Sequence, residues 1–254
     1  MPVSRHAYLI LAHHEPRLLA ALVSQIDDSR NDIFLHVDRK SDMRQFDGIR
    51  PKLSGFHLVS RVRVFWGDVS QIMAEYAALK CAVAHGGYSH YHLVSGVDLA
   101  LNGQDYIHRV CDDELPDREF VSFTFGGQRD KIRRFSELRY FCESACRSRV
   151  PAVRRFSRLI QVCAFALQKA VGYRRRFPME LQDGDQWFTI TDAFARYLLE
   201  NEGLALKMFR HVRCCDEMLV PTFAYNSRFR DRLFCTAPGQ ANGMREIDWS
   251  RGRP

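Results

Sequence analysis

The sequence predicts an α/β protein with a mostly parallel central sheet flanked by helices. In the first 127 residues, short apolar runs typical of buried strands alternate with segments whose apolar residues recur every three or four positions. Strands that alternate with helices in this way usually form a parallel sheet covered by helices. The length of 254 residues is enough for one large domain or two small ones, with ample core.

Each element follows from a local pattern. The first strand is expected in HAYLILAHH, and a helix begins at Pro16, because proline suits the first turn of a helix. A second strand, DIFLHVD, ends at Asp38. Extended sequence in FHLVSRVRVFW leads to a helix over 70–84, opened by Asp68 and Gln71 at the spacing of a capping box. Further strands are expected in YHLVSGVDL, EFVSFTF and GDQWFTIT, and further helices in DYIHRVCD and DAFARYLLEN.

Polar residues at the predicted strand ends mark a binding site. In open α/β sheets, ligands bind in the crevice outside the carboxyl ends of the strands. Asp38, the corner Trp66–Asp68 and the segment Ser95–Asp98 should therefore meet in one crevice. His13, next to His14 at the end of the first strand, either faces that crevice or has a structural role.

The positive charge is concentrated in one segment. The chain has a net charge of +7, but residues 131–176 contain 13 Lys and Arg against only Glu137 and Glu143, so the remainder is net acidic. This favours an anionic partner: phosphates, an acidic polysaccharide or a membrane surface. The apolar stretch in FSRLIQVCAFALQKAVGY is too short to span a bilayer. It is expected to be either a core helix with a basic flank or a helix lying in a membrane interface.

Several protein classes do not fit the sequence. The first apolar run is too short for a secretory signal, and no run is long enough for a membrane-spanning helix. The eight cysteines match neither a zinc site nor a disulfide framework, which is typical of free thiols in the cytoplasm. The common nucleotide-binding, hydrolase and zinc-protease motifs are absent from the sequence.

Seven sequence blocks, in this order, resemble a known family: AYLILAHHEPRLL, DIFLHVDRKSD, VFWGDVSQIMA, YHLVSGVDLAL, GDQWFTIT, CDEMLVPTFAYNS and REIDW. From about residue 6 to 252, the chain resembles the core-2/I-branching β-1,6-N-acetylglucosaminyltransferases of glycosyltransferase family 14, which are related to the peptide O-xylosyltransferases. The resemblance implies a single nucleotide-sugar-binding domain of the GT-A type over 1–254. Within it we expect a donor-binding half at 1–127, a basic helical insertion at 128–178 and an acceptor and catalytic half at 179–254.

The same resemblance implies the reaction. It implies transfer of GlcNAc, or a related sugar such as xylose, from a UDP-sugar to a saccharide or lipid-linked glycan, with inversion and with neither a divalent metal nor a cofactor. Metal-using relatives carry Asp-x-Asp after the strand YHLVSGVDL, where this chain has Ser95-Gly96-Val97-Asp98. The sequence Asp183-Gly184-Asp185 lies far downstream, and we interpret it as a coincidental match.

The resemblance also assigns donor-binding residues. In REIDW, Arg245 matches an arginine that neutralises the leaving diphosphate; no lysine follows it, so Arg251 or Arg253 substitutes or the natural chain continues. Each assignment has an alternative: a turn at Asp38, packing at Trp66, a cap at Asp98 and a surface ion pair at Arg245. The complete predicted donor set is His13, Asp38, Trp66, Gly67, Ser70, Ser95, Gly96, Asp98, Arg245 and Arg251.

Glu217 is the predicted catalytic base. An inverting transfer needs a base to take the proton of the acceptor hydroxyl, and the family places a glutamate in a Pro-Asp-Glu block. Here the block reads Cys215-Asp216-Glu217, and the alternative is that the two acids cap the following helix. The predicted acceptor-binding residues are Lys131, Arg134, Asp185, Gln186 and Trp187, with core packing as the alternative for Trp187.

The sequence also predicts a location. We expect a cytoplasmic enzyme, peripheral on the inner face of a membrane through residues 131–176, with no nucleic-acid partner. The rival hypothesis is a non-catalytic basic protein that binds carbohydrate or nucleic acid, since the basic segment alone would permit it.

Overall fold

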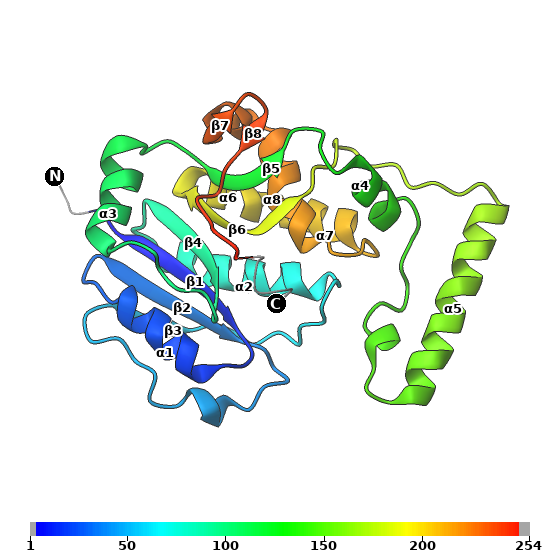
Figure 1. Cartoon of the computed structure of the whole chain (residues 1–254), viewed down its shortest axis with the longest axis horizontal. Coiled ribbons are helices and arrows are strands. Elements are labelled where there is room, and N and C mark those ends of the chain that lie inside the picture. Colours follow the sequence, from blue (N-terminus) through cyan, green and yellow to red (C-terminus); the bar gives the residue numbers. More distant parts are fainter. Residues whose placement is uncertain (1–3, 249–254) are drawn as a thin grey trace.

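A single mixed sheet forms the centre of the molecule. The computed structural model describes residues 4–248, and its eight strands lie in the order β3-β2-β1-β4-β6-β5-β8-β7 (Figure 1). Strands β1 to β4 are parallel. Strand β6 is antiparallel to β4 and β5, and β8 is antiparallel to β5 and β7, so six of the eight strands run in one direction. The predicted α/β class is confirmed.

The predicted elements are present, with small shifts at their ends. The strands are β1 (His6–Ala12), β2 (Asn31–Val37), β3 (Gly55–Leu58), β4 (His90–Ser95), β5 (Phe120–Thr124), β6 (Gly184–Thr191), β7 (Cys235–Ala237) and β8 (Gln240–Ala241). The longer helices are α1 (Pro16–Gln25), α2 (Ser70–His85), α3 (Gln104–His108), α4 (Arg129–Ser136), α5 (Pro151–Ala170), α6 (Asp192–Glu200), α7 (Glu202–Phe209) and α8 (Asp216–Tyr225). Short helical turns are η1 (Met43–Phe46), η2 (Arg109–Glu114), η3 (Ala145–Arg147) and η4 (Arg228–Arg232).

The sheet divides the core into two layers. Successive side chains of a strand point to opposite faces. In β1, Ala7 and Leu9 belong to the larger core, with residues of α2, α6, α7 and α8. Tyr8 and Ile10 belong to the smaller core, which α1 covers. The strand ends therefore carry residues of both layers to the same edge of the sheet.

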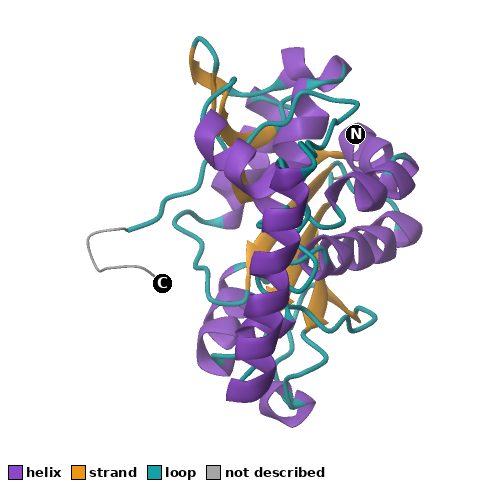
Figure 2. Cartoon of the chain, turned by 90° about the vertical axis from the view of Figure 1, so that its right-hand side faces the viewer, coloured by secondary structure: helices purple, strands orange, loops and turns teal. Residues whose placement is uncertain are grey.

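Helix α5 of the basic insertion does not join either core. Helix α5 lies apart from the sheet in Figure 1 and runs along the near side in Figure 2. Its two buried residues are the polar Ser157 and Gln161, whereas Phe156 and Leu167 are each 66% exposed. The core-helix alternative for this stretch is wrong, because its large apolar side chains face outward. Within residues 4–248, no helix combines the length and the apolar character needed to cross a membrane.

Gly184 sets the packing at the start of β6. It pairs with Phe123 of β5, and a Cβ at position 184 would lie 2.7 Å from Phe123 Cβ and still closer to the Ser122 carbonyl oxygen. Both obstacles belong to the sheet itself, so the strand cannot yield without losing its register.

We expect Gly184→Ala to lower the free energy of unfolding by about 3 kcal/mol, because the added methyl group forces β5 and β6 apart. Gly203→Ala is the matched control: the control site, at the start of α7, has no atom within 4 Å of the added Cβ. That change should leave stability equal or raise it by about 0.5 kcal/mol. Urea unfolding of both variants measures the effect, and equal stabilities would contradict the packing account.

Candidate active site

One edge of the sheet gathers most of the predicted residues. At the carboxyl end of β1, the backbone N–H of Asp38 donates to the Ala12 carbonyl and that of Gly96 to the Leu11 carbonyl, each at 2.9 Å. Leu93 pairs with Phe188 across the antiparallel β4 and β6, so β6 begins beside the end of β4. The predicted crevice at this edge thus receives residues from β1, β2, β4 and β6.

Gly96 lets these strand ends approach. A Cβ at position 96 would lie 2.8 Å from Ala12 Cβ, so only glycine fits without a shift. Just beyond it, Asp98 Oδ2 accepts a hydrogen bond from the Ser95 N–H at 2.9 Å. Burial raises the pKa of Asp98, against the opposing effects of that hydrogen bond and of Arg245. Asp98 thus closes the turn Ser95–Asp98 that precedes it instead of capping the next turn, and Arg245 lies within its electrostatic reach.

The predicted base lies in the first turn of α8. Glu217 is about one third exposed, and its Oε2 accepts a hydrogen bond from Lys131 Nζ at 2.6 Å. The same ammonium group donates to Asp183 Oδ2 at 2.7 Å. Burial alone would lower the pKa of Lys131, but the bonds to Asp183 and Glu217 raise it above its ordinary value. Lys131 therefore stays charged and fixes the Glu217 carboxylate.

Asp185 joins this group from the start of β6. Burial raises its pKa, which a hydrogen bond from Ser122 partly offsets, and it is in electrostatic contact with Glu217, Lys131 and Arg245. Asp185 thus lies within electrostatic range of both the predicted base and the predicted diphosphate-binding arginine.

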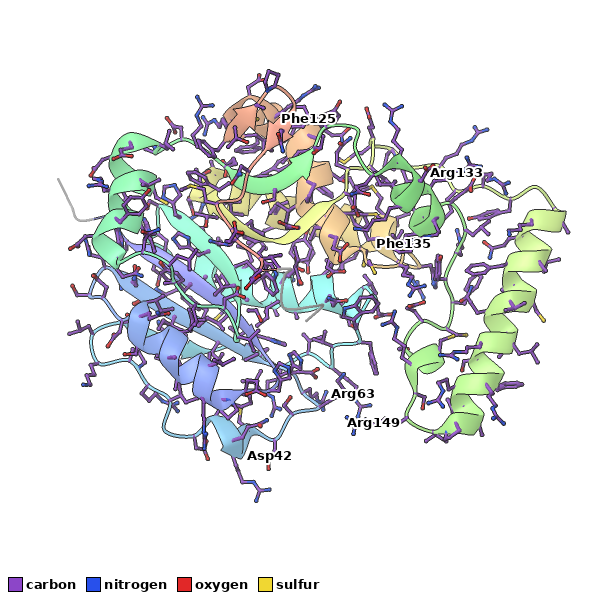
Figure 3. The ribbon with its side chains drawn as sticks, in the orientation of Figure 1. Asp42, Arg63, Phe125, Arg133, Phe135 and Arg149 are labelled. Carbon is purple, nitrogen blue, oxygen red and sulfur yellow. The ribbon has the colours of Figure 1, made fainter. Side chains whose placement is uncertain are left out.

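The remaining acceptor predictions have different outcomes. Gln186 Nε2 donates to Glu75 Oε1 at 2.7 Å, so its amide is engaged within the protein. Trp187 is half-buried and packs against the larger core, which is the packing alternative. Arg134 is exposed on α4, and its guanidinium lies 4.8 Å from the ring centroid of Phe135. Figure 3 labels Phe135 and its helix neighbour Arg133 on α4, and Phe135 packs against the larger core.

Two carboxyl groups near Glu217, those of Asp216 and Glu75, are buried, which the sequence analysis did not predict. Asp216 is 5% exposed and Glu75 is 4% exposed. Asp216 Oδ2 accepts from Gln71 Nε2 at 2.7 Å, whereas Asp216 Oδ1 and Glu75 Oε2 find no hydrogen-bond partner among residues 4–248. Burial, with a further contribution from Glu217, raises the pKa of Asp216 to about 7. Burial, and then the neighbouring Asp216, raises the pKa of Glu75 well above its ordinary value.

The Trp66 corner is built around Gln71. Gly67 has a φ of +73°, a left-handed conformation that favours glycine. Its N–H donates to Gln71 Oε1, and its carbonyl accepts from the Cys214 N–H at 3.1 Å. In a capping box, the Gln71 side chain would accept a hydrogen bond from the Asp68 N–H. In the structure it accepts from the Gly67 N–H instead, one residue earlier. Trp66 is 55% exposed, and the Arg147 guanidinium of the insertion lies 3.8 Å from its ring centroid.

The other predicted donor residues lie nearby. Asp38 is buried, and its Oδ1 accepts from the Lys40 N–H at 2.9 Å, so it forms the turn that the sequence allowed as an alternative. Ser70 is buried, and its Oγ accepts from the Phe65 N–H at 2.8 Å. His13 is exposed and stacks on His14, with ring centroids 3.9 Å apart. Burial and His14 lower the pKa of His13.

Arg245 crosses to the face of β6 that points away from α8. Its Nη2 donates to the Phe188 carbonyl and to Thr189 Oγ1, both at 3.1 Å. Its buried Nε has no hydrogen-bond partner within the described part of the chain. Burial lowers the pKa of Arg245, and Asp98 opposes that shift. The surface ion-pair alternative does not describe this residue, and Arg251 lies outside the described residues.

A buried chain of hydrogen bonds holds Arg245. Thr189 Oγ1 lies 2.8 Å from His92 Nδ1, His92 Nε2 lies 3.0 Å from His6 Nδ1, and His6 Nε2 lies 3.1 Å from Asp112 Oδ1. Arginine can only donate and a carboxylate can only accept, so the donors must all point from Arg245 toward Asp112. The sequence analysis missed these histidines, since each occupies an ordinary buried strand position.

The electrostatics support that polarity. Burial lowers the pKa of His6 to about 4 and that of His92 well below its ordinary value, so both rings are neutral at pH 7. Burial opposes ionisation of Asp112, but hydrogen bonds with His108, His6 and His90 hold its pKa far below the usual range. A cation and an anion therefore terminate a chain of neutral groups.

Two groups of side chains that could ligate a metal ion lie at the opposite edge of the sheet. Among the described residues, two trios have ligand atoms within 4.8 Å of one another: His6 with His90 and Asp112, and Asp32 with His57 and His85. His6 and His90 are the first residues of β1 and β4, opposite the crevice. Neither trio includes Glu217 or its neighbours.

The comparison with protein families identifies the chain. Its sequence matches the model of the Core-2/I-Branching enzyme over residues 6–254. The chain belongs to the Core-2/I-branching enzyme family. It is a glycosyltransferase, which sets the non-catalytic alternative aside.

Comparisons with solved structures and with curated proteins do not narrow the function of this Core-2/I-branching enzyme further. It is similar to a structure titled "X-ray structure of the mannosyltransferase Ktr4p from S. cerevisiae" over 89% of this chain and 67% of that chain. The identity is 10% and the TM-score is 0.32, a similarity too loose to support a functional inference. No curated protein matches the sequence significantly.

The Asp216 carboxyl should make the stability of this Core-2/I-branching enzyme pH-dependent. Its pKa is higher in the folded protein than in the unfolded chain, so the unfolded state releases the proton first as pH rises. The folded protein therefore loses stability between about pH 4 and pH 7, and Asp216→Asn, which cannot titrate, should escape that loss.

We expect the stability of Asp216→Asn relative to the parent to rise by roughly 2 kcal/mol between pH 5 and pH 8. Urea unfolding at the two pH values measures it. Asp113→Asn, at an exposed position in η2, is the matched control and should show no such change. The same relative stability of Asp216→Asn at both pH values would contradict a raised pKa.

Proposed function

We propose that this glycosyltransferase transfers GlcNAc, or a related sugar such as xylose, from a UDP-sugar to a saccharide hydroxyl, with inversion and without a divalent metal. One observation carries the proposal: Lys131 fixes the partly exposed Glu217 carboxylate at 2.6 Å, and β6, which holds Arg245 through Phe188 and Thr189, has Asp185 near its start, within electrostatic range of both Glu217 and Arg245. A candidate base and a candidate leaving-group cation thus border the same small region, as a single displacement at an anomeric carbon requires.

In this proposal, Glu217 accepts the proton of the acceptor hydroxyl. Its carboxylate is partly exposed and oriented by Lys131 at 2.6 Å. General-base catalysis needs a positioned, accessible acceptor of this kind. Lys131, which is bonded to Glu217, and Asp185, which lies within its electrostatic range, would then contact the incoming saccharide.

Arg245 would neutralise the diphosphate as UDP leaves. A fixed cation that meets developing negative charge in a partly dehydrated site lowers the barrier. Two hydrogen bonds through Nη2 hold the guanidinium, and its Nε remains unpartnered within residues 4–248. The contribution of Arg251 stays a prediction.

The donor nucleotide would lie along the strand ends. Trp66 and His13 are exposed there and can stack on the uracil or contact the ribose. Gly67 and Gly96 let the backbone come close, while Asp38, Ser70, Ser95 and Asp98 shape the loops through their own hydrogen bonds. A thermal-shift screen across nucleotide sugars would identify the nucleotide and the sugar together.

The acceptor is proposed to be a glycan, with a lipid-linked glycan as the preferred form. The excess of basic residues in 131–176 suits a lipid diphosphate or an anionic membrane, and it supports a peripheral location on the cytoplasmic face. We do not expect a nucleic-acid partner or a cofactor.

Glu217→Gln tests the base. The amide keeps the size of the side chain and can still accept from Lys131, but it cannot take a proton. We expect UDP release from UDP-GlcNAc in the presence of EDTA and an acceptor to fall by about 10²–10⁴-fold. UDP affinity, measured by calorimetry, should stay unchanged. Glu200→Gln, at an exposed position on α6, is the control, and full activity of Glu217→Gln would refute the assignment.

Trp66→Ala tests the donor corner. Because the Trp66 side chain is 55% exposed, its removal should cost little stability, about 1 kcal/mol or less. If the ring stacks on the nucleotide base, the Kd for UDP should rise about tenfold or more. Leu53→Ala, at a site 65% exposed and outside the crevice, should change neither quantity. A large loss of stability with unchanged UDP affinity would show that Trp66 serves packing.

A further inference from the structure

Helix α5 binds the rest of the insertion through polar groups. Gln161 Oε1 accepts from the Phe141 N–H at 2.9 Å, and Gln168 Oε1 accepts from the Arg139 N–H at 2.8 Å. Gln168 Nε2 also donates to the Arg139 carbonyl at 3.2 Å. The inward face of α5 therefore carries an amide ladder along the backbone of residues 139–141, beside the half-buried Phe165, whose ring centroid lies 4.9 Å from that of Tyr140.

The outward face of α5 is apolar. At 100° per residue, six large apolar side chains fall within about one third of the helix circumference, beside Cys163, while Val162, 62% exposed, lies among the basic residues. This is the reverse of the usual surface helix, whose apolar stripe faces the core. The members and their exposed fractions are Val153 44%, Phe156 66%, Leu159 59%, Ile160 39%, Leu167 66% and, just after the helix, Val171 69%.

The flank beside that apolar face is basic. Arg155, Arg158 and Lys169 are exposed and lie between the apolar face and the amide ladder, and the sequence of α5 contains no acidic residue. Figure 3 shows Arg149 next to the amino-terminal end of the helix, and the exposed Arg174 and Arg176 follow its carboxyl end. The helix thus combines an exposed apolar stripe with a positively charged border.

We propose that α5 lies in the interface of an anionic lipid bilayer, with its apolar face at the acyl boundary and its basic flank among the head groups. Interfacial helices have this combination of a basic polar face and large apolar side chains. Each basic residue near an anionic surface adds to the attraction. The proposal deepens the lipid-linked acceptor suggested above and rests on the proposed function only for that acceptor.

The charge argues for lipid over a second copy of the chain. Pairing two α5 faces would bring together two segments that each carry 13 Lys and Arg against two acids. Such like-charge contacts disfavour association, whereas an anionic bilayer neutralises them.

Cys163 offers a direct probe, since it lies on the apolar face and is exposed. We would label Cys163 with an environment-sensitive fluorophore in full-length Cys235→Ser protein, because Cys235 is the other fully exposed thiol. Vesicles of phosphatidylcholine with about one third phosphatidylglycerol should shift the emission to the blue, and pure phosphatidylcholine should do so far less. A label at Cys235 in Cys163→Ser protein should not shift. No shift at Cys163 with anionic vesicles, or equal shifts with both lipids, would overturn the proposal.

Sedimentation with the same anionic vesicles tests the two faces separately. The triple variant Phe156→Ser, Leu159→Ser, Leu167→Ser should bind the vesicles at least about tenfold more weakly than the parent. The triple variant Arg155→Gln, Arg158→Gln, Lys169→Gln should bind more weakly than the parent, and the binding that remains should lose most of its salt sensitivity. The control Arg17→Gln, Lys52→Gln, Lys207→Gln removes three exposed charges elsewhere and should bind nearly as the parent does.

Two further measurements separate the outcomes. If light scattering shows a dimer in solution that the apolar triple variant abolishes, while vesicle binding is unchanged, α5 is an interface between copies and the proposal fails. UDP release from a soluble donor should be the same in both α5 variants and the parent. Vesicle binding without turnover of any UDP-sugar would refute the proposed function and leave the membrane proposal standing.

Discussion

The Gln71 side chain joins two segments of the glycosyltransferase at its candidate site, the Trp66 corner and the start of α8. Its amide oxygen accepts from the Gly67 N–H, and its amide nitrogen donates to Asp216 at 2.7 Å. Because Gln71 is buried, either bond left unmade would cost the full desolvation of a polar group. The Trp66 corner and the start of α8, which carries Glu217, therefore keep a fixed relation to each other.

Strand β6 then separates the buried acids Glu75 and Asp216 from the cation Arg245, which lie on its two faces. Its side chains alternate between faces, so Gln186 and Phe188 point to the layer of α2 and α8, and Thr189 points to the layer that holds Arg245. Acids kept near neutral by burial gather on the first side, and a cation held by neutral groups lies on the second. Asp185, at the beginning of the strand, is in electrostatic contact with both. A site of this form can take a proton on one side and stabilise a leaving anion on the other.

The sequence predicts the parts of this arrangement that depend on local patterns. Strand periodicity placed β1, β2, β4 and β6, and the rule on strand ends brought Asp38, Gly96 and Trp66 to one edge. It could not pair Gln71 with Asp216, since 145 residues separate them and nothing local encodes the contact. The histidine chain below Arg245 was equally hidden, because a buried histidine and a buried apolar residue occupy a strand in the same way. For α5, the apolar stretch and its basic flank left a core helix and an interfacial helix both open, because the sequence alone does not say which face meets the protein.

The orientation of α5 bears on the site through η3. Arg147 of η3 stacks on Trp66, and Glu143 pairs with Arg147 at 3.0 Å and with Arg213 at 3.3 Å. Arg213 lies in the loop that leads to α8, so Glu143 ties the insertion to the segment that presents Glu217. A cation stacked on an aromatic ring and a bridging carboxylate are directional contacts, more sensitive to displacement than apolar packing. A helix seated in a bilayer would therefore set the position of the donor corner relative to the membrane surface, where the head group of a lipid-linked acceptor lies.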